Sequence, residues 1–322
     1  MIANNSYEQN RLLNQVLTMH FIEEKKQSTI ASTLGLSTAK VNRLIKQAKE
    51  QGLLEINIRM PFQNLFDLEK QIRDCFGTRD AFIIPNAAVE EEAMYQTVGR
   101  AAANYLLQNL RDGDTICIAS GKGVHAMVHA LESRRSYDVR VVPASGSGFD
   151  SHFKDVNYLA SHLAGKLGGK AVELHAPYYV DTPKERDFLV SMRQIREVLD
   201  IARNAQIAVF GIGSVIPDTS SFFNMTKISK KDKENIVVKE KAHGDINGCF
   251  FNAKGEPCAI PYAKRKIGLD LNEIAKIPLS IGVSTTQEKV IPICAALNGN
   301  YLKTLVTDEE TAKDVLNLKS NE

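Results

Sequence analysis

From Ala81 to the end of the chain, short β-rich runs alternate with amphipathic helical stretches, and this alternation limits the possible folds more than any other feature. It is typical of a parallel, doubly wound α/β sheet with helices on both faces. Strands are predicted at residues 81–84, 115–119, 139–143, 206–211, 279–283 and 304–306. Helices are predicted at 93–110, 124–131, 156–167, 195–202, 288–297 and 309–316. We therefore expect an α/β domain over residues 81–322, with ligands bound beyond the carboxyl ends of its strands.

The loop after the strand at 115–119 has the composition of an anion site. It reads Ser120-Gly121-Lys122-Gly123 and leads directly into a helix. Glycines let backbone N–H groups approach an anion, the helix N-terminus adds positive potential, and the serine and lysine supply a hydroxyl and a charge. The spacing is neither that of a Walker loop nor that of a dinucleotide fingerprint, which argues against a nucleotide. The loop is predicted to bind a phosphate, and a tight turn with a surface lysine is the alternative.

Other polar segments are predicted to reach the same edge of the sheet. Asp245 is predicted to accept hydrogen bonds from ligand hydroxyls, and Lys289, in the first turn of a helix, to face a ligand phosphate. On spacing alone, either residue could equally be a surface charge. Loops after two strands supply the remaining candidates for effector binding, which are Ser145, Gly146, Ser147, Gly211 and Gly213.

The first 60 residues have the spacing of a helix-turn-helix. Helices are predicted at 7–24, 28–34 and 38–50, with a small residue, Ala31, four positions before a turn glycine, Gly35. Ser37 is placed to cap the third helix, whose apolar positions would seat it against the second. The outward positions of the third helix suit base edges and phosphates, and a helical hairpin with a solvated basic face is the alternative. The predicted DNA-binding residues are Thr38, Lys40, Asn42, Arg43 and Lys46.

Charge is unevenly distributed along the chain. Residues 1–60 hold eight Lys and Arg and five Glu, a net of 8 − 5 = +3, whereas the whole chain carries +2. A basic N-terminus favours a polyanion partner, here double-stranded operator DNA. One such module makes few phosphate contacts, so we expect a dimer or tetramer. Residues 61–80 are predicted to form a helical linker that packs either against its copy or against the larger domain.

Several classes of protein are excluded by composition. No apolar run reaches the length of a membrane span and no signal peptide is present, so a cytoplasmic protein without a membrane partner is expected. The five cysteines are widely spaced and form no CxxC pair, which predicts reduced core thiols, no metal site and no cofactor.

The order of these features resembles the SorC family of sugar-responsive bacterial regulators, over nearly the whole chain. The resemblance implies an effector domain similar to sugar-phosphate isomerases and deaminases, and a dimeric or tetrameric regulator. It also implies a phosphorylated sugar or polyol bound near the loop Ser120–Gly123, Asp245 and Lys289. The motifs that carry it are Lys40-Val41-Asn42-Arg43-Leu44, Gly211-Ile212-Gly213, His243-Gly244-Asp245-Ile246, and the stretch from Ala295-Ala296-Leu297-Asn298-Gly299 to Thr307-Asp308-Glu309-Glu310-Thr311.

The chain departs from the family pattern at the first loop and after the third strand. It has no tryptophan, and it has Lys122 and Gly123 where family members often have a hydroxyl pair. The sequence directly after the third strand reads Ala144-Ser145-Gly146-Ser147 and holds no lysine, which excludes a covalent Schiff base there. An isomerase- or deaminase-type enzyme with a DNA-binding appendage is the alternative function. Asp245, His243, His125 and Lys289 are available, but no acid/base pair with catalytic spacing emerges, so no enzyme is predicted.

Overall fold

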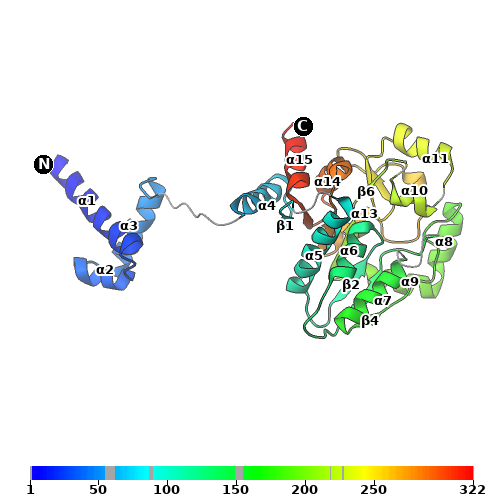
Figure 1. Cartoon of the computed structure of the whole chain (residues 1–322), viewed down its shortest axis with the longest axis horizontal. Coiled ribbons are helices and arrows are strands. Elements are labelled where there is room, and N and C mark those ends of the chain that lie inside the picture. The colour runs from blue at the N-terminus through cyan, green and yellow to red at the C-terminus, as the bar shows by residue number, and fades with distance from the viewer. Residues whose placement is uncertain are drawn as a thin grey trace. The chain divides into compact units, whose positions relative to one another are not determined.

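The computed structural model describes residues 2–54, 62–86, 90–148, 155–217, 219–226 and 228–321. It divides into two compact units, Met1–Pro61 and Phe62–Glu322, and each is described by itself (Figure 1). The predicted domain boundary at residue 60, together with two charges counted at the N-terminus, Glu55 and Arg59, lies outside the described residues. No described helix is both long and apolar enough to cross a membrane.

The first unit is helical and contains the predicted helix-turn-helix. Gly35 ends the second helix in the left-handed region, at φ 65°, and the N–H of Gly35 bonds to Ala31 O. Ser37 caps the third helix by accepting a hydrogen bond from Lys40 N at 3.2 Å. The helices are α1 (Ile2–Leu17), a π-helical turn η1 (Thr18–Ile22), α2 (Gln27–Leu34) and α3 (Thr38–Glu50).

The prediction that the first helix continues to residue 24 is wrong. The α-helix gives way at residue 18 to the wider π turn, which changes the direction of the following side chains. As a result Ile22 is 78% exposed and Phe21 lies at the surface, whereas Val16 and Met19 are buried.

The second unit is built on a seven-stranded sheet in which every described pair of neighbours is parallel, so the predicted doubly wound fold is confirmed. Side chains alternate between the two faces: Ile116 and Ile118 pack on one, Cys117 on the other. In spatial order the strands are β1 (Asp80–Ile84), β10 (Thr304–Asp308), β9 (Leu279–Val283), β5 (Ile207–Gly211), β2 (Thr115–Ile118), β3 (Arg140–Pro143) and β4 (Lys170–Ala171).

Helices cover both faces of this sheet. One apolar cluster joins the strands to α5 (Glu91–Asn109), α6 (Lys122–Ala130) and α7 (Val156–Leu167). The other face is covered by α4 (Gln63–Phe76), α9 (Arg193–Arg203), α13 (Leu271–Lys276), α14 (Val290–Asn298) and α15 (Glu309–Ser320).

Helix α4 corresponds to the predicted linker, and its apolar face is used within the larger unit. Leu65, Leu68 and Ile72 are buried in the same cluster as Ala312 and Val315 of α15. The buried face of α4 therefore packs on the larger domain, as one of the two alternatives predicted. The exposed face of α4 remains available for the predicted self-association.

The elements that the sequence did not predict are short. They include a small antiparallel sheet of β6 (Gly213–Ser214), β7 (Gly244–Ile246) and β8 (Cys249–Phe251). The predicted helix at 288–297 is divided into a 3-10 turn, η4 (Gln287–Lys289), and α14. The other additions are the edge strand β4, α8 (Pro183–Ser191), α10 (Ser221–Thr226), α11 (Lys230–Glu234), the π turn η3 (Asn235–Lys239), α12 (Ile260–Ala263) and α13.

Candidate functional site

A pocket lies where the strand order of the large sheet reverses. The chain runs from β2 outward to β3 and β4, and then from β5 outward to β9 and β10, so that β2 and β5 are neighbours at the switch point. The loops after β2, β5 and β9 all line this pocket, which is the position where open α/β sheets bind ligands. An adjoining cavity of about 370 Å³ shares its lining at Tyr95, Lys122 and Met225, so the two form one cleft.

Nine of the eleven predicted effector residues line this pocket within the described chain, although they come from five separate segments. Gly146 and Ser147 do not: a Cβ on Gly146 would lie 2.3 Å from Pro177 O, and the Ser147 hydroxyl accepts from Asn157 Nδ2 at 2.9 Å. Both hold their loop against neighbouring backbone. The nine that line the pocket are Ser120, Gly121, Lys122, Gly123, Ser145, Gly211, Gly213, Asp245 and Lys289.

Three of the pocket glycines are required by close contacts or by backbone conformation. A Cβ on Gly213 would lie 1.9 Å from Asp245 Oδ1, so this glycine leaves room for the carboxylate. A Cβ on Gly123 would lie 2.4 Å from Val283 O, so α6 can pack on β9 only with a glycine there. Gly121, at φ 148°, has a backbone conformation that other residues rarely adopt.

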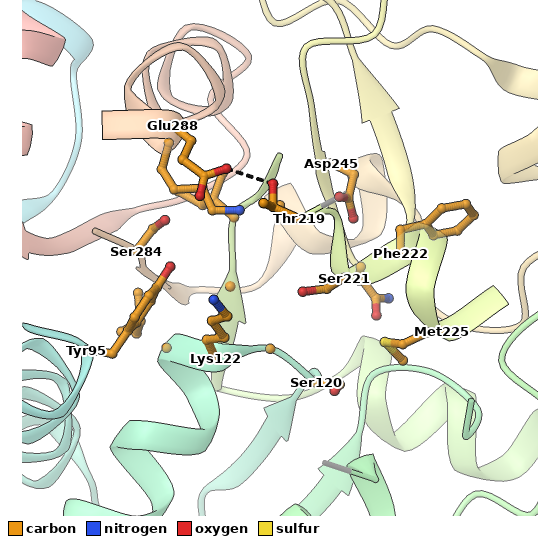
Figure 2. A pocket seen from close by; sticks show the side chains of 18 of the residues that line it. Tyr95, Ser120, Lys122, Thr219, Ser221, Phe222, Met225, Asp245, Ser284 and Glu288 are labelled. Atoms are coloured by element: carbon orange, nitrogen blue, oxygen red, sulfur yellow. Dashed lines mark hydrogen bonds between the residues drawn. The ribbon is translucent and has the colours of Figure 1, made fainter. Parts of the chain in front are cut away.

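Lys122 lies at the edge of the pocket and is already paired. Its ammonium group is 2.9 Å from Glu91 Oε1 and 5.6 Å from the centre of the Tyr95 ring. The lysine side chain is 55% exposed, so water screens the pair and its energy is that of an ordinary surface ion pair. In Figure 2, Lys122 and Tyr95 lie on the same side of the pocket.

Lys289 differs from Lys122 because it is buried. The residue is 9% exposed, and its ammonium group forms no ion pair or hydrogen bond with other residues of the described ranges. Burial lowers the pKa of Lys289, and the nearby Asp245 and Glu288 carboxyl groups oppose that shift. The pocket thus holds a desolvated cation, which an anionic ligand would stabilise.

Asp245 lies at the start of a hairpin and is 7% exposed. Burial raises its pKa, while a hydrogen bond donated by Gly248 N at 3.0 Å and the charges of Lys289 and Lys266 act in the opposite direction. Within the described residues its other oxygen, Oδ1, accepts no hydrogen bond, so the carboxylate can accept hydrogen bonds from ligand hydroxyl groups.

Several lining residues were missed by the sequence reasoning. Figure 2 shows Thr219 and Glu288 joined by a hydrogen bond of 2.7 Å. One residue had a detectable signal: Asn247-Gly248 lies between the alternating segment 242–246 and the apolar run 249–251, which predicts a two-residue hairpin, and both have positive φ. The others lie in helices, in irregular segments or at a strand end. They are Glu91, Tyr95, Tyr178, Ile212, Thr219, Ser221, Phe222, Met225, Val283, Ser284 and Glu288.

On the first unit, α3 presents the predicted DNA-binding side chains at its surface. Thr38, Asn42, Arg43 and Lys46 are exposed and Lys40 is half-buried. Lys46 has only a loose partner, Glu50, at 3.7 Å, with both side chains mostly exposed. The opposite side of α3 is fully used by the core, since its apolar residues are buried.

Comparisons with known proteins agree with this geometry. Residues 60–317 match the sequence family described as "Putative sugar-binding domain". The chain is 26% identical over 315 residues to the deoxyribonucleoside regulator of Bacillus subtilis, covering 96% of this chain and 98% of that protein. It is 26% identical to the sorbitol operon regulator of Klebsiella pneumoniae, whose full-length crystal structure has a TM-score of 0.74 and covers 95% of this chain and 98% of that one. The chain belongs to the SorC family of sugar-binding transcriptional regulators.

Family membership confirms the resemblance drawn from the sequence and decides between its two functional alternatives. The relatives are named as transcriptional regulators, so this SorC-family protein is a regulator and the isomerase or deaminase alternative is set aside. The described residues contain no group of three or more potential metal ligands.

Proposed function

We propose that this SorC-family regulator binds operator DNA in the bacterial cytoplasm through α3, and that a small phosphorylated sugar or polyol in the pocket changes its operator affinity. The observation that carries the proposal is Lys289, a buried ammonium group without an ion-pair partner in the described chain, facing a pocket beside the N-terminus of α6. Burying a cation is costly unless it is paired. A phosphate group would supply the missing charge and three acceptor oxygens.

The pocket contains groups that suit both the phosphate and the hydroxyl groups of such a ligand. The glycine loop after β2 and Lys289 provide N–H groups and positive charge for a phosphate. Asp245, Ser145 and Asn247 provide acceptors and donors for hydroxyl groups. Because Lys122 is paired with Glu91, it would contact the phosphate only by exchanging that partner.

A thermal-shift screen with matched ligand pairs tests the proposal. The pairs are sorbitol 6-phosphate with sorbitol and 2-deoxyribose 5-phosphate with 2-deoxyribose, together with other sugar phosphates. A ligand that binds only the folded state at 100 times its Kd adds about 2.7 kcal/mol of stability. For a unit of this size that corresponds to roughly 5 to 11 °C in Tm. Equal shifts from a phosphorylated ligand and its dephosphorylated partner would contradict the proposed phosphate site.

We also propose that the regulator acts as a dimer or tetramer. A single α3 makes few phosphate contacts and binds weakly at physiological salt. Phe62 and Phe66, at the start of α4, are 59% and 50% exposed, and they offer an apolar surface for self-association. Analytical ultracentrifugation of the Phe66→Asp variant tests this proposal. The variant should dissociate at concentrations where the unsubstituted protein is oligomeric. An unsubstituted protein that is monomeric would contradict the proposal.

A further inference from the structure

The segment from Ser284 to Lys289 joins the pocket to helix α15. On one side, Ser284, Glu288 and Lys289 line the pocket. On the other side, the segment contacts the N-cap residue of α15 and two residues in the first two turns of that helix. Thr285 Oγ1 bonds to the Asp308 carboxylate, Thr286 N donates to Thr311 Oγ1 at 3.2 Å, and Gln287 Nε2 donates to the Asp314 carboxylate.

Thr286, at the centre of this segment, has a strained backbone. Its φ of 92° and ψ of 153° fall in a region that is almost restricted to glycine, and a β-branched residue fits there poorly. Its hydroxyl oxygen is buried, and no residue of the described ranges lies in hydrogen-bonding geometry to it. A cavity of about 340 Å³, lined by Thr285, Thr286 and Gln287, lies beside the segment. Strain, an unsatisfied hydroxyl and adjacent space together indicate a segment with a second accessible conformation.

Helix α15 in turn holds the first turn of α4. Asn64 Nδ2 donates to Glu309 Oε1 at 2.8 Å, and Leu65 and Leu68 pack in the same cluster as Ala312 of α15. Helix α4 is the first element of the effector unit, and the chain enters it from the DNA-binding unit. A displacement of α15 therefore reaches the point where the two units are joined covalently.

We propose that the segment 284–289 and α15 form the mechanical route by which ligand binding in the pocket is communicated to α4. The inference rests on the proposed function, since a ligand must contact Lys289 for the segment to respond. A ligand can shift a two-state element only if it binds the two conformations with different affinities. Lys289 follows the strained Thr286 by three residues and is bonded to it through Lys289 N and Thr286 O at 3.0 Å, so pulling the lysine toward an anion changes the backbone that holds α15.

Hydrogen–deuterium exchange of the full chain, with and without sorbitol 6-phosphate or inorganic phosphate, tests the route. A probe that protects peptides covering 284–289 should also change the exchange of peptides covering α4. Two substitutions at exposed positions interrupt the route at its ends: Gln287→Ala and Asn64→Ala. The matched control is Asn86→Ala, because Asn86 Nδ2 donates to Glu310 Oε2 at 2.9 Å and so binds the same helix terminus without contacting α4.

The inference expects both route variants to keep the protection at 284–289 and to lose the change at α4, while the control keeps both. Protection at 284–289 without any change at α4 in the original chain would overturn the route and leave the proposed function intact. A control that loses the α4 response as fully as Asn64→Ala would also overturn it. No protection at 284–289 with either probe would overturn the phosphate site and the route together.

Discussion

The Lys289→Met substitution tests what the buried positive charge of Lys289 contributes to ligand binding, apart from the other groups of the pocket. Methionine keeps most of the volume of the lysine stem and removes the charge, so the walls formed by β9 and α14 keep their packing. The ammonium group has no ion pair within the described chain, and the buried Asp245 carboxyl group keeps the charge of Lys266 when that of Lys289 is removed.

The expected loss of ligand affinity follows from the burial of Lys289. A hydrogen bond to a charged group contributes about 1.5 to 3 kcal/mol, which corresponds to roughly 10-fold to 150-fold in Kd. Lys122 provides the comparison: a pair between exposed charges contributes about 0.2 to 1 kcal/mol, or roughly 1.4-fold to 5-fold. The Lys122→Met variant should therefore lose much less affinity, since its side chain is 55% exposed and already bonded to Glu91.

Calorimetric titration with a phosphorylated ligand and with its dephosphorylated analogue measures both effects. Lys289→Met should weaken the phosphorylated ligand only. Because burial lowers the pKa of Lys289, the original chain should lose phosphate affinity as the pH rises through that lowered pKa, and the variant should lack this decline. Equal losses for both ligands, or a larger loss for Lys122→Met, would refute the reasoning.

Three further predictions concern the pocket carboxylate, a glycine and the DNA-binding helix. Burial raises the pKa of Asp245, so between the unfolded and the folded pKa value the folded chain binds more protons than the unfolded chain. The free energy of unfolding therefore falls as the pH rises through this range. Asp245→Asn should reduce that fall, which urea denaturation at a series of pH values from acid to neutral measures. Gly213→Ala should destabilise the unit by about 1 to 3 kcal/mol in urea denaturation, because the added Cβ would lie 1.9 Å from Asp245 Oδ1. Gly211→Ala is the control and should be tolerated, because the nearest atom to its added Cβ is 3.8 Å away. Arg43→Ala should weaken specific operator binding by about 1 to 3 kcal/mol in fluorescence anisotropy if the guanidinium reads a base, and Lys184→Ala on α8 should leave it unchanged.

The sheet could be predicted from the sequence because its strands are short apolar runs bounded by glycine or polar residues. Leu279–Val283 was predicted with its observed bounds, since apolar residues alternate with small ones along this run and a helical stretch follows. Helices α3 and α7 were also predicted with their observed bounds, because an apolar stripe runs through each, and the predicted cap Ser37 precedes α3.

The pocket could be predicted only in part. Residues that follow a strand, such as Ser120 and Gly211, were found because parallel strands bring their carboxyl ends together. Tyr95 and Tyr178 were missed because one lies within a helix and the other in an irregular segment, and only the folded chain brings them to the pocket. Gly146 was placed in the site because it follows a strand, but backbone packing explains that glycine.

The central claim is that occupation of the pocket by a phosphorylated ligand changes operator affinity. The most direct test is fluorescence anisotropy of the operator, titrated with the full chain alone, with the phosphorylated ligand that gives the largest thermal shift, and with its dephosphorylated analogue at the same concentration. The account predicts that the phosphorylated ligand alone changes operator affinity, by roughly 5-fold to 150-fold for a typical coupling of about 1 to 3 kcal/mol. An operator affinity that is identical under all three conditions, or that responds equally to both ligands, would contradict it.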